Sequence, residues 1–214
     1  MRLDHVSYVA SHDQISDVVN RIGSQIGTAF VDGGIHPKFG TRNFTAPLLN
    51  GQYIEVVSPM DHPATDITPF GQIVKKKATQ GGGWLSWVIS TDNLHLIENR
   101  MGRKAVNAIR KKPDSTELRW KQLGVMGTIS DYQLPFFIQW QNLVHPSDDG
   151  IKTASIYSIE MKGEENAVRK WLDCEIGQVL QGVEILWNMG ADPLIPNGIQ
   201  AVTFNVGGDR IRID

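Results

Sequence analysis

The feature that most constrains the fold of this chain is an internal repeat. Residues 5–11 (His-Val-Ser-Tyr-Val-Ala-Ser) align with residues 84–90 (Trp-Leu-Ser-Trp-Val-Ile-Ser), and both segments have the alternation typical of half-buried strands. An amphipathic stretch follows each copy, over 13–23 and over 93–112, which predicts a helix after each strand. A chain with such a repeat is expected to fold as copies of one strand-and-helix unit.

Each copy continues with further strands. Residues 52–57 match residues 136–141 at a similar distance after the helix, and a third, weaker copy begins at 155–159. Runs rich in Gly, Pro, Ser and Asp separate the copies. Strand-rich units that each contain one helix predict the α+β class. The predicted units are residues 1–60, residues 82–147 and a degenerate third unit at 151–214.

Composition excludes several classes of function. Lys and Arg number 21 against 23 Asp and Glu, so the formal charge of -2 creates no field that attracts nucleic acid or an anionic membrane. The basic runs 75–77 and 110–112 are expected on solvated faces. The single Cys174 excludes an internal disulfide, and residues 1–5 lack the apolar stretch of a signal peptide, which predicts a cytoplasmic protein. The sequence contains no phosphate-binding glycine motif, so no nucleotide cofactor is expected.

Side-chain alternation along the strands predicts a cavity. His5 and Ser7 share one face of their strand, and the residues between them face the helix. Residues 84–90 repeat this alternation, so Trp84 and Ser86 are expected on the same face as His5 and Ser7. The same alternation places Glu55, Phe137 and Gln139 of the later strands on that face. In strand 117–121 the apolar Leu118 and Trp120 are expected to face the helices, which turns Arg119 inward. Polar groups among aromatic rings are typical of small-molecule sites. The predicted lining is His5, Ser7, Glu55, Trp84, Ser86, Arg119, Phe137 and Gln139.

Several segments of the chain resemble a known family. These are 3–6 (Leu-Asp-His-Val), 34–43 (Gly-Ile-His-Pro-Lys-Phe-Gly-Thr-Arg-Asn), 53–57 (Tyr-Ile-Glu-Val-Val) and 134–140 (Leu-Pro-Phe-Phe-Ile-Gln-Trp). They are similar to the glyoxalase-like domain family of the vicinal oxygen chelate superfamily, and the resemblance extends over residues 3 to about 147. It implies βαβββ modules paired into a curved, half-open mixed sheet with helices on its convex side.

The resemblance also implies a divalent metal, with Zn, Mn, Fe, Ni and Mg all candidates. Superfamily enzymes commonly hold it with a His on the first strand and a Glu on the last strand of a module, and His5 and Glu55 match these places. The second unit offers Trp84 and Gln139 there, which are poor ligands. His36 would be a third ligand. The alternatives are a His5–Glu55 hydrogen bond that organises the pocket floor and a turn that His36 merely caps.

Two functions stay open at this stage. In the first, a metal-dependent lyase, isomerase or dioxygenase uses Glu55 and His36 in catalysis, and Asn43 and Arg119 hold a substrate carboxylate or carbonyl beside Trp84, Ser86, Phe137 and Gln139. In the second, a metal-free protein sequesters a small organic molecule, as bleomycin-resistance proteins do. Alternatively, Arg119 forms a salt bridge and binds no ligand. The third unit is expected either to pack on the edge of the first pair or to mediate a homodimer.

Overall fold

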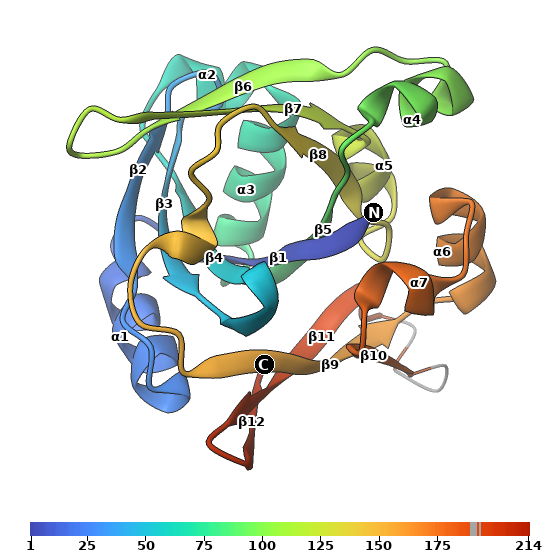
Figure 1. Ribbon diagram of the computed structural model, residues 1–214. Helices are drawn as coiled ribbons and strands as arrows, with labels where there is room; N and C mark the ends of the chain where they lie inside the picture. Colours follow the sequence, from blue (N-terminus) through green and yellow to red (C-terminus); the bar gives the residue numbers. More distant parts are fainter. Residues whose placement is uncertain (189–191, 193) are drawn as a thin grey trace.

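The computed structural model describes residues 1–188, 192 and 194–214. Its first eight strands close into a barrel in the order β1-β4-β3-β2-β6-β7-β8-β5 (Figure 1). In each half the first strand pairs in parallel with the last, β1 with β4 and β5 with β8, and β1 pairs antiparallel with β5. The predicted α+β fold with a curved mixed sheet is confirmed. The barrel strands are β1 (Arg2–Val9), β2 (Val31–His36), β3 (Thr41–Pro47), β4 (Tyr53–Pro59), β5 (Gly83–Ser90), β6 (Val106–Lys111), β7 (Glu117–Leu123) and β8 (Phe136–Trp140).

The first predicted helix, over 13–23, corresponds to α1, but the second differs from the prediction. The expected single helix over 93–112 is wrong, because α4 ends at Met101 and the chain then forms strand β6. Gly102 takes the left-handed conformation (φ 60°), and the N–H of Arg103 donates to the carbonyl of Glu98, which closes the helix. The helices are α1 (Ile15–Ile26), α2 (Pro63–Ile67), α3 (Pro69–Thr79), α4 (Leu94–Met101), α5 (Val125–Ser130), α6 (Glu165–Leu172) and α7 (Ile176–Leu180), with short 3₁₀ turns η1 (Leu49–Gly51) and η2 (Pro146–Asp148).

Gly33 and Gly34 of strand β2 permit the barrel to close. Strands β2 and β6 meet at a single paired position, Ile35 with Lys111. A Cβ atom on Gly34, whose φ is 92°, would lie 1.7 Å from the carbonyl oxygen of Lys111. A Cβ atom on Gly33 would lie 2.2 Å from Asn43 Oδ1 inside the barrel. The pair of glycines therefore allows both the close strand contact and the space for a polar side chain.

Helix α3 differs from α1 in the face of the sheet that it covers. The buried Ile15, Ile22 and Ile26 of α1 pack on the convex face, in the larger of two apolar clusters. In contrast, Phe70, Ile73 and Val74 of α3 pack with residues on the inner face of the barrel, and Figure 1 shows this helix within the ring of strands. One end of the barrel is therefore closed by a helix on the concave side.

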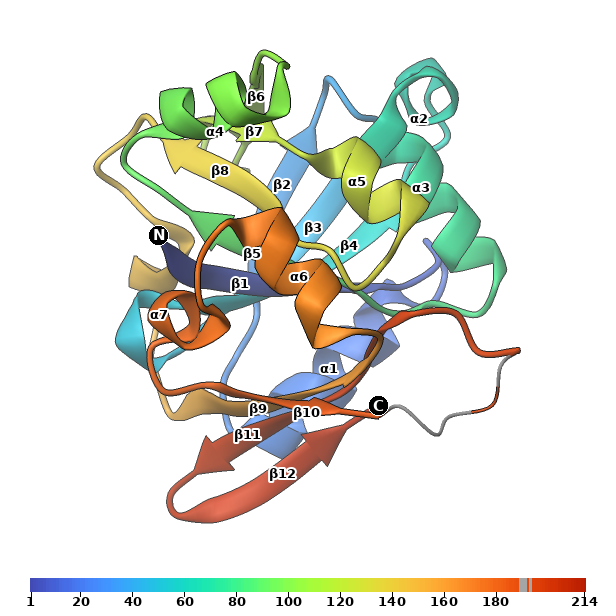
Figure 2. The ribbon, with the colours of Figure 1, turned by 90° about the vertical axis from the view of Figure 1, so that its right-hand side faces the viewer.

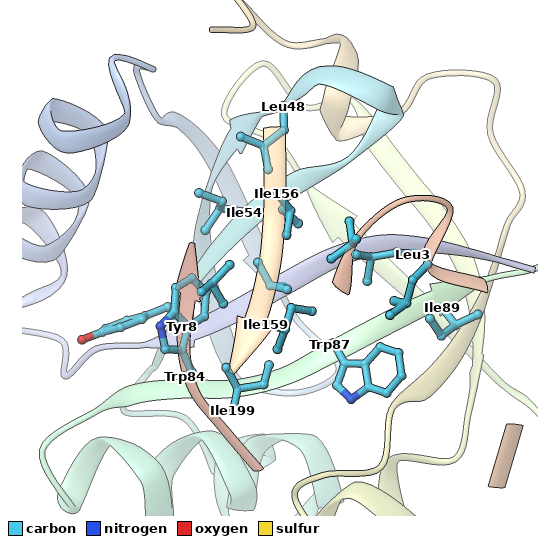
Figure 3. Close-up of a cluster of buried hydrophobic side chains, with 14 of the residues drawn as sticks. Leu3, Tyr8, Leu48, Ile54, Trp84, Trp87, Ile89, Ile156, Ile159 and Ile199 are labelled. Carbon is cyan, nitrogen blue, oxygen red and sulfur yellow. The ribbon is translucent and has the colours of Figure 1, made fainter. Parts of the chain in front are cut away.

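The third unit forms a separate sheet against the outside of the barrel. Its strands lie in the order β10 (Glu184–Trp187), β9 (Ala154–Lys162), β11 (Gly198–Val206), β12 (Asp209–Ile213), and Figure 2 shows these strands below the barrel. Barrel residues such as Leu3 and Trp87 interlock there with Ile159 and Ile199 (Figure 3). This sheet covers a face of β1 and β5, so the expected packing on an edge of the paired units differs from the observed arrangement. None of the helices in the described ranges is long and apolar enough to cross a membrane.

Candidate functional site

A small cavity lies inside the barrel, between the inner face of the strands and α3. About 30 Å³ of it is open to the centres of water-sized groups, enough for about two waters. Polar side chains and aromatic rings both contribute to its wall. The lining residues are His5, His36, Phe39, Asn43, Tyr53, Glu55, Phe70, Arg110, Trp120, Gln122, Phe136, Ile138 and Trp140.

Glu55 on β4 occupies the centre of the polar side of this cavity and is 5% exposed. Ser7 Oγ donates to its Oε2 (2.8 Å) and Asn43 Nδ2 donates to its Oε1 (2.7 Å). Burial raises the pKa of this carboxyl, but the nearby His5 and His36 and the two hydrogen bonds outweigh burial and leave the pKa below its ordinary value. Glu55 is therefore an anion at neutral pH, and each carboxylate oxygen keeps a further lone pair.

His5 is held in one tautomer by Asp4. An ionised carboxylate can only accept, so the 2.8 Å contact between His5 Nδ1 and Asp4 Oδ1 places the proton on Nδ1. Burial raises the pKa of Asp4, but hydrogen bonds from His145 and His5 bring it well below its usual range, which keeps Asp4 ionised. The free Nε2 of His5 then lies 4.0 Å from Glu55 Oε2. A carboxylate behind a histidine is the arrangement that supports metal-ligating histidines in proteins.

His36 faces Glu55 from the opposite side, at the end of β2. Its Nδ1 lies 2.9 Å from the hydroxyl of Thr41, and its Nε2 lies 4.0 Å from Glu55 Oε1. Burial lowers the pKa of His36 to about 4, since it outweighs the attraction of Glu55 for the protonated ring. The ring is therefore neutral at pH 7 and offers a lone pair. When Thr41 accepts from Nδ1, that lone pair is on Nε2, toward the carboxylate.

Arg110 supplies the positive charge of the cavity. Its side chain comes from β6 and is 2% exposed. Neither Nε nor Nη2 has a hydrogen-bond partner within the part of the chain that the structure describes. Burial lowers the pKa of Arg110, yet a guanidinium keeps its charge at physiological pH. A buried cation with unused donors is costly unless an anion binds to it, so Arg110 marks a place for one.

The structure brings four of the predicted site residues together in the cavity lining, places Ser7 behind them as a donor to Glu55, and places five others elsewhere. His5, His36, Asn43 and Glu55 all line the cavity. Ser86 faces inward opposite Ser7 on the neighbouring strand but lies outside the lining. The remaining four residues are Trp84, Arg119, Phe137 and Gln139, and all of them lie on the outer side of the barrel.

Arg119 is the clearest reversal of the expected parity. It is exposed on the outer face of β7, where Nη2 donates to Glu117 Oε2 (2.7 Å), and Trp120 points into the cavity instead. The expectation assumed that apolar residues face helices. Leu118 and Trp120 of β7 are buried on the cavity side, whereas Arg119 and Lys121 are exposed on the outer face. The apolar face of this strand is therefore the inner one.

The other three outer residues have structural contacts. Trp84 Nε1 donates to the carbonyl of Ile213 (2.9 Å) in the third unit. Phe137 is fully buried and stacks on Trp171 of α6, with ring centroids 6.4 Å apart. Gln139 accepts from the N–H of Leu94 (3.4 Å) and donates to the carbonyl of Asp92 (2.8 Å), which joins β8 to the start of α4.

His5, His36 and Glu55 have the donor chemistry of a divalent-metal site, two imidazole nitrogens and one carboxylate. Within the described ranges no three His, Cys, Asp or Glu side chains are arranged closely enough to hold an ion as they stand. The two nitrogen-to-oxygen separations are 4.0 Å. Ligands about 2.1 Å from one tetrahedral ion would lie roughly 3.4 Å apart. The residues therefore fit a metal by type, and the side chains would have to move closer together to bind it.

Comparison with known proteins agrees with this architecture. A family model described as a glyoxalase-like domain matches residues 3–174. The chain belongs to the glyoxalase-like domain family. This family is part of the vicinal oxygen chelate superfamily, so the resemblance found in the sequence is confirmed. No curated protein matches the chain.

A comparison with solved structures gives the following similarities, of which the first shows the same fold. A hypothetical protein from Staphylococcus aureus superposes with a TM-score of 0.68 at 18% identity, over 97% of this chain and 92% of that chain. A methylmalonyl-CoA epimerase from Mycobacterium tuberculosis gives 0.42 at 13% identity, over 65% and 86% of the two chains. A Streptomyces coelicolor methylmalonyl-CoA epimerase variant in complex with 2-nitronate-propionyl-CoA gives 0.44 at 12% identity, over 68% and 96%.

Proposed function

We propose that this protein is an enzyme that binds a small, oxygen-rich organic anion in the barrel cavity and acts on it with a divalent metal. The observation that carries the proposal is the convergence of His5 Nε2 and His36 Nε2 on opposite oxygens of Glu55, each 4.0 Å away. The reaction belongs to the lyase, isomerase or dioxygenase classes of the superfamily.

Each side chain of the cavity has a separate role in this proposal. His5, His36 and Glu55 would hold the metal, which when bound polarises adjacent oxygens of a substrate. Arg110 pairs with the anionic group through its unused donors. A pKa of about 4 makes His36 a weak base at pH 7, so it suits the role of ligand better than that of proton acceptor.

A second function has one observation in its favour. Both oxygens of Glu55 already accept hydrogen bonds from Ser7 and Asn43, so the carboxylate is satisfied without a metal. In that case Arg110 and the aromatic wall bind an organic anion without reaction, and the protein sequesters it.

Metal content distinguishes the two functions. Protein purified without chelators, and protein supplied separately with Zn, Mn, Fe, Ni or Mg, is analysed by elemental mass spectrometry after desalting. We expect about one bound metal per chain, lost in His5→Ala, His36→Ala and Glu55→Ala and kept in the control His95→Ala, whose side chain is exposed on α4. Folded wild-type protein that retains no metal under any of these conditions contradicts the enzyme proposal and favours sequestration.

Three further expectations stay predictions. They are the division into units 1–60, 82–147 and 151–214, a homodimer, and a cytoplasmic location. Light scattering over a wide concentration range tests the dimer.

A further inference from the structure

The barrel cavity is too small for an organic molecule of more than a few heavy atoms. Its 30 Å³ compares with the 10–15 Å³ that one water requires, so it holds a head group of a few atoms. A second hollow of about 190 Å³ lies next to it, and the two share Phe39, Phe70 and Gln122 as walls. The remainder of a ligand whose head group sits in the cavity therefore has a place to lie. This second hollow is called the outer groove below.

The outer groove combines an apolar floor with a positive rim. Val106, Leu123, Val125 and Met126 contribute apolar surface. The charged residues of its described lining are Lys38, Arg103 and Lys104, and no carboxylate is among them. Such a groove complements a ligand with an apolar body and a negative far end.

One turn links the groove to the cavity. Between β2 and β3, His36 lines the cavity, Phe39 forms part of the shared wall, and Lys38 lines the groove. The rings of Phe39 and Phe70 are 5.4 Å apart, and the ring of His36 lies 6.4 Å from each of them. Phe39 and Phe70 therefore form part of the wall between the two spaces, and a ligand that reaches both spaces has to displace these rings.

The turn itself is fixed against the rest of the protein. Gly40 has φ 65°, and a Cβ atom there would lie 2.2 Å from Thr65 Oγ1. Thr65 Oγ1 donates to the carbonyl of Gly40 (2.7 Å). This contact fixes the backbone of the turn at the boundary between the cavity and the groove.

We propose that the ligand of this protein is an organic dianion with an apolar middle, whose first anionic group meets Arg110 in the cavity and whose second meets Lys38, Arg103 and Lys104 at the outer groove. This inference rests on the proposed function and names its substrate class. The apolar middle passes between Phe39 and Phe70 and lies on the floor of the groove. A monoanion of the same length lacks the second contact.

Calorimetric titration with two matched series tests the inference. The probes are straight-chain α,ω-dicarboxylates of four to ten carbons and the monocarboxylates of the same lengths, at low salt. We expect at least one dicarboxylate to bind about tenfold more tightly than its matched monocarboxylate, since three partly screened charge pairs each contribute about two- to threefold. That advantage should decrease at high salt.

Variants assign the advantage to the groove. The triple variant Lys38→Ala/Arg103→Ala/Lys104→Ala should lose the advantage and keep the affinity for monocarboxylates. The matched control Lys76→Ala/Lys121→Ala/Lys170→Ala removes the same charge from other surfaces and should keep the advantage. Circular dichroism melts establish that each variant is folded.

The failures of the two proposals differ. If monocarboxylates bind through Arg110 and no dicarboxylate binds more tightly, or if the triple variant keeps the advantage, the inference is overturned and the cavity function stands. If neither series binds, or if Arg110→Met leaves the binding of both series unchanged, the anion site in the cavity is overturned together with the groove.

Discussion

The two halves of the barrel, β1–β4 and β5–β8, share a strand order and a pairing pattern but line the cavity with opposite chemistry. The first half contributes His5, His36, Asn43 and Glu55, whereas β7 and β8 contribute mainly rings and aliphatic groups, among them Trp120. An internal repeat thus specifies the path of the backbone and leaves the inward side chains free to differ. The first half carries the candidate metal ligands, and the second half encloses them and adds the charge of Arg110.

In the second half, the outer faces of β5 and β8 hold the barrel against neighbouring elements. Trp84, Phe137 and Gln139 contact the third unit or α4. Successive residues of β8 therefore alternate between the two roles, with Phe136 and Ile138 at the cavity and Phe137 between them on the outside. Three predictions test this difference between cavity-facing and outward-facing residues.

The largest effect is expected for Phe137→Ala. The side chain is fully buried and packs against Trp171, whose ring also fills the space beside Gly127, where a Cβ atom would lie 2.3 Å away. Loss of the ring leaves a cavity at this contact and should lower the free energy of unfolding in urea by about 3–5 kcal/mol.

Binding in the cavity of the folded Phe137→Ala protein should be unchanged. Phe136→Leu provides the matched control, because the neighbouring ring lines the cavity. It should alter ligand affinity at a smaller cost in stability. If Phe137→Ala abolishes anion binding while the protein stays folded and stable, the outer face is part of the site and the comparison fails.

The second prediction concerns pH and the polar half. Burial lowers the pKa of His36 from 6.5 to about 4. In that interval the unfolded chain binds a proton at His36 and the folded chain does not, so acid favours unfolding. The contribution of His36 to the free energy of unfolding should be fully present above pH 6.5. The free energy of unfolding should fall by up to about 3 kcal/mol as the pH falls to 4.

The measurement is urea unfolding of metal-free protein at a series of pH values. His36→Gln should flatten this part of the profile, whereas His62→Gln, a change in an exposed residue at the start of α2, should not. An identical slope in His36→Gln would assign the pH dependence to other groups.

The sequence predicts the polar half better than the apolar half, and the reason is physical. On β1 and β4 the helix-facing residues are apolar and the cavity-facing residues are polar, so alternation alone brings His5 and Glu55 to the same face. On β7 the cavity side is apolar, and the same rule turns Arg119 inward when it lies outside.

Arg110 escapes detection for a different reason. Ala105 and Ile109 continue the helical spacing of α4, so the break at Gly102 and the strand after it are missed. Without β6, the run 110–112 has the pattern of an exposed basic patch. The helix-ending glycine was the available signal.

Asp4 could not be found from local pattern at all. Its contacts to Trp140 and His145 join residues 136 and 141 positions apart, and the pairing of β1 with β5 shifts between Leu3 and His5. Asp4 fixes the tautomer of His5 from outside the cavity. This role becomes visible only when folding brings β1 next to the segment that contains Trp140 and His145.

The smallest of the three effects comes from Arg110→Met, compared with Arg119→Met. Arg110 is the charge that the apolar half contributes to the cavity, and its Nε and Nη2 lack partners among the described residues. Methionine keeps much of the apolar stem volume, so the free energy of unfolding should stay level or rise by about 1 kcal/mol. The affinity for pyruvate, measured by calorimetry, should weaken by about 2 kcal/mol, because a charge-assisted pair is lost.

Arg119→Met changes an exposed side chain paired with Glu117 and should alter neither quantity measurably. If the two substitutions weaken binding equally, both faces of the second half contribute to the site, and the assignment of chemistry to the cavity face alone is wrong.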